Sequence, residues 1–227
     1  MIEARGLVKS YHDGGREVRP LDGVDFSCRR GEFILIVGRS GSGKTTFLNV
    51  LGGLTRPTTG SVTVAGKDIL ALSDAECSAL RSHTIGFVFQ FPGLLSTLSA
   101  RENVALSAEI AGTTESKSAS TGRARDLLER VGLREKADSP PAHLSGGELK
   151  RTAIARALMN SPSLILADEP TADLDVDTER EVMELFREIN REGTTVIMVT
   201  HNIDLASYAS RVVRMEKGKL VPVEPVQ

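Results

Sequence analysis

Residues 38 to 45 have the types and spacing of a loop that binds phosphate. Three glycines let the backbone turn its N–H groups inward, and a following helix would point its positive end at the same place. Lys44 adds a full positive charge, and the Thr45 hydroxyl can coordinate a phosphate-bound Mg²⁺. The pattern is G-x-x-x-x-G-K-[ST], which favours a phosphate loop over a glycine turn before an ordinary helix. The residues expected at the phosphates are Gly38, Arg39, Ser40, Gly41, Ser42, Gly43, Lys44, Thr45 and Thr46.

Two adjacent carboxylates, Asp168 and Glu169, form a second candidate group. They follow the apolar run Leu164 to Ala167, which predicts a buried strand, and ligands collect at the carboxyl ends of strands in open α/β sheets. Asp168 can hold Mg²⁺ through water, while Glu169 can orient or deprotonate an attacking water. An acidic pair at a surface is usually only solvated, but the preceding strand and the upstream loop favour a catalytic pair here.

Polar residues also follow two further apolar runs. Gln90 comes after Ile85 to Phe89, and His201 comes after Thr195 to Val199 and Thr200. If these runs are strands of the same parallel sheet, both side chains lie at the edge where phosphate would bind. A single histidine after a strand is usually structural, and the residues alone leave that alternative open for His201.

A further candidate is the segment Ser145-Gly146-Gly147-Glu148, which opens a predicted helix. A serine with a glutamate three residues later is an ordinary capping box. A helix mouth with two glycines can also bind an anion. Taken alone, the residues favour the cap.

Buried strands and amphipathic helices must position these groups. Phe33 to Val37 is an unbroken apolar run, typical of a parallel strand buried on both faces. The apolar residues that recur after the loop at helical spacing are Phe47, Leu48, Leu51 and Leu54. The other predicted elements are a strand at Ser61 to Val64, helices at Ser73 to Arg81 and Asp175 to Glu192, and a final hairpin of Arg211 to Met215 and Leu220 to Val223.

Two regions differ from this alternating core. Ile2 to Tyr11 and Val18 to Cys28 predict an antiparallel flap joined by a turn at His12 to Gly15, in which Tyr11 alone reads as a half-buried aromatic. Ser99 to Leu144 predicts a helical insertion, with a polar mobile loop at Gly112 to Gly122.

Composition excludes several classes of function. The 28 lysines and arginines balance 30 acidic residues, and no long basic run indicates a dedicated nucleic-acid binder. Eighteen apolar residues nowhere run together, and the N-terminus has no apolar core for secretion, so we expect a cytoplasmic chain that does not span a membrane. Cys28 and Cys77 are expected to be free thiols.

The order and spacing of the phosphate loop, Gln90, LSGGE, LILADEPTADLD and His201 resemble those of ABC-transporter ATPases over essentially the whole chain. The resemblance identifies Gly38 to Thr45 as the Walker A loop, Leu164 to Asp168 as the Walker B strand and Glu169 as the catalytic carboxylate. It implies an α/β fold with a P-loop NTPase core, which is a mostly parallel sheet flanked by helices. An N-terminal antiparallel β flap would precede this core, and an α-helical subdomain would be inserted into it. The implied single ABC domain is 1–227, with the core and flap at 1–90 and 160–227 and helices at about 91–159.

The resemblance also assigns residues that geometry alone leaves open. It implies that Gln90 touches Mg²⁺ and senses a membrane subunit, that His201 contacts the γ-phosphate, and that Tyr11 stacks on adenine. Other residues would complete the site of the opposite subunit in a homodimer that sandwiches ATP and Mg²⁺ head to tail. They are Ser145, Gly146, Gly147 and Glu148 of the signature motif and Asp175 of the loop that starts at Ala172.

Finer features, from Gly86 to Leu106 and at Glu148, are similar to the lipoprotein-releasing and macrolide-efflux branch. That branch implies an ATPase that drives separate permease subunits from the inner face of the cell membrane. The chain departs from it at three points: Leu149-Lys150 replaces a glutamine pair, Asp173 adds a carboxylate, and residues 112–122 are unusually plain.

The candidates for docking the permease are Leu94, Leu95 and Leu98, which could instead belong to the core of the insertion. Two other functions stay open within the ABC family. One is a machine that transmits motion through a membrane partner to cell-wall enzymes, and the other is a soluble ATPase that acts on DNA or ribosomes. The balanced charge argues against the latter, and no nucleic-acid partner is expected.

Overall fold

The computed structural model describes residues 1–14 and 16–222, and their strands form one antiparallel and one mostly parallel sheet. The antiparallel sheet has the order β2-β1-β4-β5, and the other has the order β10-β9-β3-β8-β7-β6. The strands are β1 (Ile2–Asp13), β2 (Arg16–Cys28), β3 (Phe33–Val37), β4 (Thr59–Val64), β5 (Lys67–Asp68), β6 (Ile85–Val88), β7 (Leu164–Asp168), β8 (Thr195–Thr200), β9 (Arg211–Glu216) and β10 (Lys219–Pro222).

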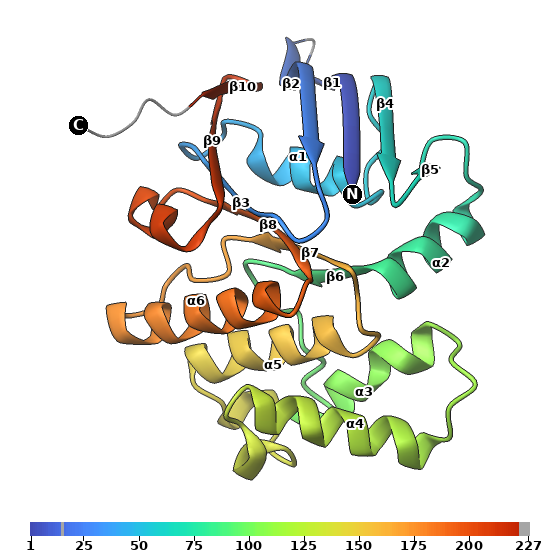
Figure 1. Ribbon diagram of the computed structural model, residues 1–227, viewed down its shortest axis with the longest axis vertical. Helices are drawn as coiled ribbons and strands as arrows, with labels where there is room; N and C mark the ends of the chain where they lie inside the picture. Colours follow the sequence, from blue (N-terminus) through green and yellow to red (C-terminus); the bar gives the residue numbers. More distant parts are fainter. Residues whose placement is uncertain (15, 223–227) are drawn as a thin grey trace.

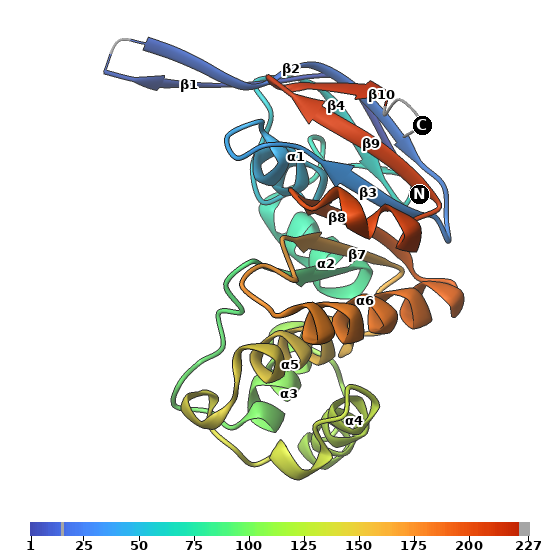
Figure 2. The same ribbon diagram turned by 90° about the vertical axis from the view of Figure 1, so that its left-hand side faces the viewer.

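Helices cover the parallel sheet and form a layer of their own below it (Figure 1). The helices are α1 (Lys44–Leu51), α2 (Asp74–Thr84), α3 (Ala100–Ile110), α4 (Lys117–Arg130), α5 (Gly146–Leu158) and α6 (Val176–Arg191), with short 3₁₀ helices at Arg134–Lys136, Pro141–His143 and Ile203–Tyr208. Turned by 90°, the molecule shows the flap at one end, the parallel sheet in the middle and α3, α4 and α5 at the other end (Figure 2).

Four of the five parallel strands, β3, β6, β7 and β8, are short and almost entirely buried on both faces, whereas β9 is only partly buried. Side chains alternate across β3, so Phe33, Leu35 and Val37 pack toward α5 and α6, while Ile34 and Ile36 pack toward α1 and the flap. The same alternation in β7 and β8 divides the apolar interior into two cores, one on each face of the sheet. The parallel pairing β3 to β8 to β7 to β6 brings the carboxyl ends of four strands to one edge.

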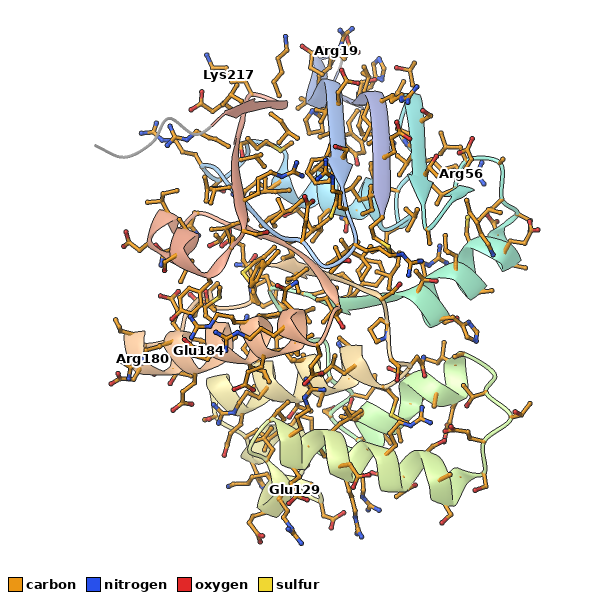
Figure 3. The ribbon with its side chains drawn as sticks, in the orientation of Figure 1. Arg19, Arg56, Glu129, Arg180, Glu184 and Lys217 are labelled. Carbon is orange, nitrogen blue, oxygen red and sulfur yellow. The ribbon has the colours of Figure 1, made fainter. Side chains whose placement is uncertain are left out.

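Helix α6 illustrates how the amphipathic helices meet this sheet. Val182, Phe186 and Ile189 of α6 are buried in the core, as their spacing predicts. Charged residues occupy the remaining surface of the helix, where Figure 3 labels Arg180 and Glu184. Helix α6 is therefore held against the sheet by the burial of one apolar stripe along its length.

The antiparallel flap and the α/β core are confirmed, with some corrections to the elements. Residues Lys117 to Gly122, expected in a mobile loop, form the first turns of α4, because Ser116 caps this helix and Ser120 is buried against its neighbours. Leu54 does not continue helix α1, which ends at Leu51 before Gly52, and its side chain is exposed. Phe89 lies beyond the end of β6.

Strand limits elsewhere differ from the expectations by a few residues, as is usual at element ends. The expected turn at His12 to Gly15 is shorter because β1 reaches Asp13, and Gly14 adopts a left-handed φ of 53°. Gly15 and the expected strand residue Val223 lie outside the described residues. We propose that the single domain has two parts, the core with its flap at 1–90 and 160–227 and the helical subdomain at about 91–159. The packing of α3 against both α4 and α5 supports this division.

Candidate active site

The phosphate loop follows β3 and begins α1 directly, so the fold places it at the carboxyl edge of the parallel sheet. Gly43 has a φ of 107°, and a Cβ atom there would lie 2.0 Å from the carbonyl oxygen of Pro20. Only glycine allows this close approach. Ser42 is buried, and its Oγ has no hydrogen-bond partner among the described residues. A buried hydroxyl without a partner at a helix N-terminus fits a ligand with acceptor oxygens.

A cavity of about 630 Å³ opens over this loop. Its lining contains Arg39 to Thr46 without a break, together with Pro20, Gln90, Glu169 and His201. A second cavity of similar size shares residues 39 to 42 and His201 with the first and extends to residues 214 to 217 of β9 and its turn. The loop, Gln90, Glu169 and His201, which lie far apart in the sequence, therefore share one cavity.

Lys44 is at the centre of the charged contacts in this cavity. Its side chain is 7% exposed, and Nζ donates to the carbonyl oxygens of Gly38 at 2.7 Å and Arg39 at 3.2 Å. Nζ also lies 3.5 Å from Oε1 of Glu169, whose side chain is 12% exposed. The carboxylate is thus held against the cation that faces the phosphate loop.

Backbone conformation and a second contact fix the direction of Glu169. Its φ is 44°, a left-handed value that costs a residue with a side chain about 1–3 kcal/mol and is concentrated at functional sites. The Glu169 N–H donates to the carbonyl oxygen of Val199 at 2.9 Å, which ties the turn to β8. Nδ1 of His201 lies 2.9 Å from Oε2 of Glu169, and the His201 backbone N–H donates to the same oxygen at 3.2 Å.

Asp168 makes a different contact from its neighbour. Its Oδ1 accepts a hydrogen bond from Oγ1 of Thr45 at 3.2 Å. Burial raises the pKa of Asp168, and the carboxylate of Glu169 adds to the increase, whereas the Thr45 hydrogen bond and the charge of Lys44 lower it. The two carboxylates therefore have separate partners, a hydroxyl for Asp168 and two cationic or ionisable groups for Glu169.

The oxygen atoms of Thr45 and Asp168 fit Mg²⁺. Mg²⁺ binds hard oxygen donors and usually takes only one or two carboxylates from the protein, with phosphates and waters as its other ligands. The described residues contain no cluster of three or more His, Cys, Asp and Glu side chains suited to a metal ion, so an all-protein metal cage is absent from them. Gln90 lines the same cavity and is exposed.

Other predicted site residues lie elsewhere in the chain. Tyr11 is a partly exposed residue of the flap, with Nζ of Lys9 4.9 Å from its ring centroid, and it does not line the two cavities beside the phosphate loop. Ser145 and Glu148 form the predicted capping box of α5, with the Ser145 N–H donating to Glu148 Oε2 at 2.7 Å. Asp175 caps α6 without such a box: its side chain accepts from the N–H groups of Asp177 and Thr178, and its hydrogen bonds to Thr178 lower its pKa.

Gly147 shows why the signature segment contains glycine even without a ligand. A Cβ atom on Gly147 would lie 2.5 Å from Cγ2 of Thr178 on α6. Ser145, Gly146, Gly147, Glu148 and Asp175 are therefore gathered at the facing ends of α5 and α6 and not at the phosphate loop of their own chain.

Lys150 is a charged residue that the sequence analysis noted only as a departure. It lies on α5 and donates from Nζ to the carbonyl oxygen of Gln90. The signal that could have identified it is its position in the apolar stripe of α5, three and four residues before the buried Ala153 and Ile154.

Comparison with known proteins gives relatives over the full length of the chain. Residues 21–172 match the family described as ABC transporter. The chain is 46% identical over 221 residues to the lipoprotein-releasing system ATP-binding protein LolD 1 of Caulobacter vibrioides, covering 97% of this chain and 94% of that protein. It is 48% identical over 222 residues to the macrolide export ATP-binding/permease protein MacB of Nitrosomonas europaea, covering 97% of this chain and 33% of that longer protein.

Solved structures agree with the sequence relatives. A dimeric structure of an ATP-binding cassette in a post-hydrolysis state, bound to ADP and Pi, matches with a TM-score of 0.92 and 36% identity over 100% of both chains. The structure of cbiO1 from Clostridium perfringens, part of the ABC transporter complex cbiONQ, matches with a TM-score of 0.85 and 32% identity, covering 97% of this chain and 86% of that one. The expected fold class is confirmed.

The raised pKa of Asp168 predicts a pH-dependent effect of Asp168→Asn on stability. A carboxyl group with a higher pKa in the folded than in the unfolded state contributes stability below the unfolded pKa and loses it as the pH rises through the folded pKa. At neutral pH the ionised Asp168 therefore costs stability, and Asp168→Asn should raise Tm. The gain should shrink as the pH falls toward about 4, the ordinary pKa of an aspartate.

The measurement is Tm across this pH range for wild type, Asp168→Asn and Asp126→Asn, which changes an exposed aspartate of α4. The control should show no such gain. A lower Tm for Asp168→Asn at neutral pH would mean that its hydrogen bond and Lys44 outweigh the cost of burial.

Proposed function

Because the chain belongs to the ABC-transporter family of ATPases, we propose that it is the subunit that binds and hydrolyses ATP to drive a separate membrane permease of the lipoprotein-releasing or efflux type. The observation that carries the proposal is the set of contacts at the phosphate loop. Glu169 contacts both Lys44 and His201. Beside them, the Thr45 hydroxyl donates a hydrogen bond to Asp168. These groups have the charges and positions that phosphoryl transfer to water requires.

The side chains divide the chemistry of ATP hydrolysis between them. Lys44 and the inward N–H groups of the loop stabilise the negative charge on the phosphates. Electrostatic stabilisation of this kind is a main source of catalysis in phosphoryl transfer. Glu169 orients a water in line with the γ-phosphate and accepts its proton, because its carboxylate lies within reach of both Lys44 and the cavity. His201 holds Oε2 of Glu169 and faces the same space.

Thr45 and Asp168 would hold Mg²⁺, with Gln90 as a further oxygen donor from the cavity lining. Held by these residues, the ion would supply Lewis-acid stabilisation of the phosphate charge. Asp168 is the buried last residue of β7, whereas Glu169 follows the strand with a left-handed φ of 44°, and the two carboxylates have different partners.

A second copy of the chain completes the proposed site. The solved structure with ADP and Pi is dimeric, which supports a homodimer here. The segment Ser145 to Glu148 and Asp175 lie together at the ends of α5 and α6, away from their own phosphate loop. In a head-to-tail dimer, this surface of one copy closes the ATP site of the other.

The proposed permease is a separate chain that holds this subunit at the inner face of the membrane. Within residues 1–14 and 16–222, no helix is both long enough and apolar enough to cross a bilayer. The connection from β6 to α3 exposes Phe91 by 76% and Leu95 by 49%, while Leu94 and Leu98 are partly buried. An apolar surface of this kind favours the docking role of Leu94, Leu95 and Leu98 over a role in the core of the insertion.

Purification from membranes tests the transport function. The full-length chain carrying an affinity tag should co-purify with an integral-membrane permease, and Leu95→Asp, on the proposed docking surface, should reduce the recovery of permease. An exposed apolar residue at the opposite end of α3 from this connection, Ile110, supplies the control Ile110→Asp. Recovery of ribosomes, of DNA or of a membrane protein that engages cell-wall enzymes would contradict the proposed transport function.

The role of Tyr11 in binding adenine gives a prediction for nucleotide affinity. Tyr11→Ala should weaken ATP binding by roughly 1–3 kcal/mol, the usual value of one base stacked on one aromatic ring. Tyr11→Phe keeps the ring and should bind normally. Titration with a fluorescent ATP analogue measures both, and an unchanged Kd for Tyr11→Ala would return this residue to a structural role.

The two roles of Ser145, cap and dimer contact, can be separated because the chain contains a matched cap. Ser73 and Glu76 form the same capping box at α2. Ser73→Arg and Ser145→Arg should each lose about 0.5–2 kcal/mol of stability through loss of the cap. Only Ser145→Arg should also abolish turnover while leaving ATP binding to each chain intact, since arginine blocks closure of the dimer.

Urea denaturation and steady-state hydrolysis on the same samples give both quantities. Equal turnover in the two folded variants would reduce Ser145 to a helix cap.

A further inference from the structure

Helix α5 holds the start of the connection from β6 to α3 through two cationic side chains. Lys150 Nζ donates to the carbonyl oxygen of Gln90. The guanidinium of Arg156 donates to the carbonyl oxygens of Pro92 and, at 2.9 Å, Gly93. Hydrogen bonds from charged donors are stronger than neutral ones, so the backbone of residues 90 to 93 is fixed to α5.

Lys150 occupies a costly position for an ammonium group. It is 7% exposed, and in the described part of the chain no carboxylate lies within ion-pair distance of it. Burial lowers its pKa, while the carboxylates of Asp173 and Glu169 act in the opposite direction. Asp173, like the pair Leu149-Lys150, departs from the related branch, and its negative charge favours the protonated form of Lys150. Burying an ammonium group carries a desolvation penalty that an apolar side chain of similar size would avoid. Packing alone therefore does not explain a lysine at this position, which needs a further reason.

The contacts of Gln90 supply that reason. Its carbonyl oxygen is held by Lys150, while the residue itself lines the phosphate cavity with Thr45 and Glu169. The carbonyl and the side chain of one residue are separated only by Cα, so fixing the first restricts where the second can enter the cavity. Position at this scale affects rate strongly, since a displacement of about 1 Å can cost roughly 100-fold.

We propose that Lys150 is a positioning residue for Gln90, which it ties to α5 so that Gln90 follows each movement of that helix. Lys150 lies about one turn after Gly146 and Gly147, the end of α5 assigned to the second copy of the chain. Contact with the second copy at the N-terminus of α5 is thereby transmitted to a residue in the phosphate cavity of the same chain. This inference rests on the proposed ATP hydrolysis, and its test separates the two.

The test is a double-mutant cycle between Lys150 and Gln90 in the full-length chain. Lys150→Met removes the charge and the donor but fills the buried space. We expect kcat for MgATP hydrolysis to fall roughly tenfold or more, with KM and the Kd of a fluorescent ATP analogue changed by less than about twofold. In a Gln90→Ala background, where there is no side chain to position, Lys150→Met should change kcat by less than about twofold.

Two further variants complete the design. Lys117→Met removes an exposed lysine of α4 and should behave as wild type. Lys150→Leu also removes the charge and the donor, and it serves if Lys150→Met does not fold. A comparable loss of kcat in the Gln90→Ala background, or a wild-type kcat for either Lys150 variant, would overturn the inference. Absence of hydrolysis by wild type would instead contradict the proposed function.

Discussion

The site depends on one constraint, the parallel pairing that carries the ends of four neighbouring strands to the same edge. In the order β3, β8, β7 and β6, these ends deliver the phosphate loop, His201, the pair Asp168 and Glu169, and Gln90. Each strand is buried on both faces, so a slip in register would exchange side chains between two close-packed cores and is strongly opposed. The 3.5 Å contact between Lys44 and Glu169 and the 3.2 Å contact between Thr45 and Asp168 follow from this pairing. The chemistry is therefore positioned by the same burial that stabilises the fold.

Much of this arrangement could be predicted from the sequence, because its signals are local. Phe33 to Val37 is an unbroken apolar run and forms β3 with the expected limits, and the polar residues after each run predict the contents of the cavity. The polar segment 112–122 was predicted less well. Its composition indicates a loop, yet a capping serine and a buried face make half of it helical, and tertiary packing decides such cases. Leu54 continued a helical pattern that Gly52 and Gly53 interrupt.

The limits of prediction are clearest where the partner is distant in sequence. The spacing of residues cannot show that Lys150 reaches the backbone of Gln90, because that contact requires α5 to pack beside the end of β6. Likewise, the capping box at Ser145 is complete within the chain, so the residues by themselves favour a helix cap over a second role in a dimer. Local patterns thus predict elements and the edge where they converge, while contacts between elements appear only in the folded structure.

The central claim is that Asp168 and Glu169 have separate tasks, and Glu169→Gln tests it most directly. The amide keeps the size of the side chain but cannot accept a proton, so turnover should fall by about 10²–10⁴ while ATP and Mg²⁺ still bind. Light scattering in ATP and Mg²⁺ should then show a persistent dimer where wild type mostly dissociates, because the uncleaved nucleotide continues to bridge two copies. Hydrolysis within a few-fold of wild type, or ATP binding without dimers, would contradict this division of tasks.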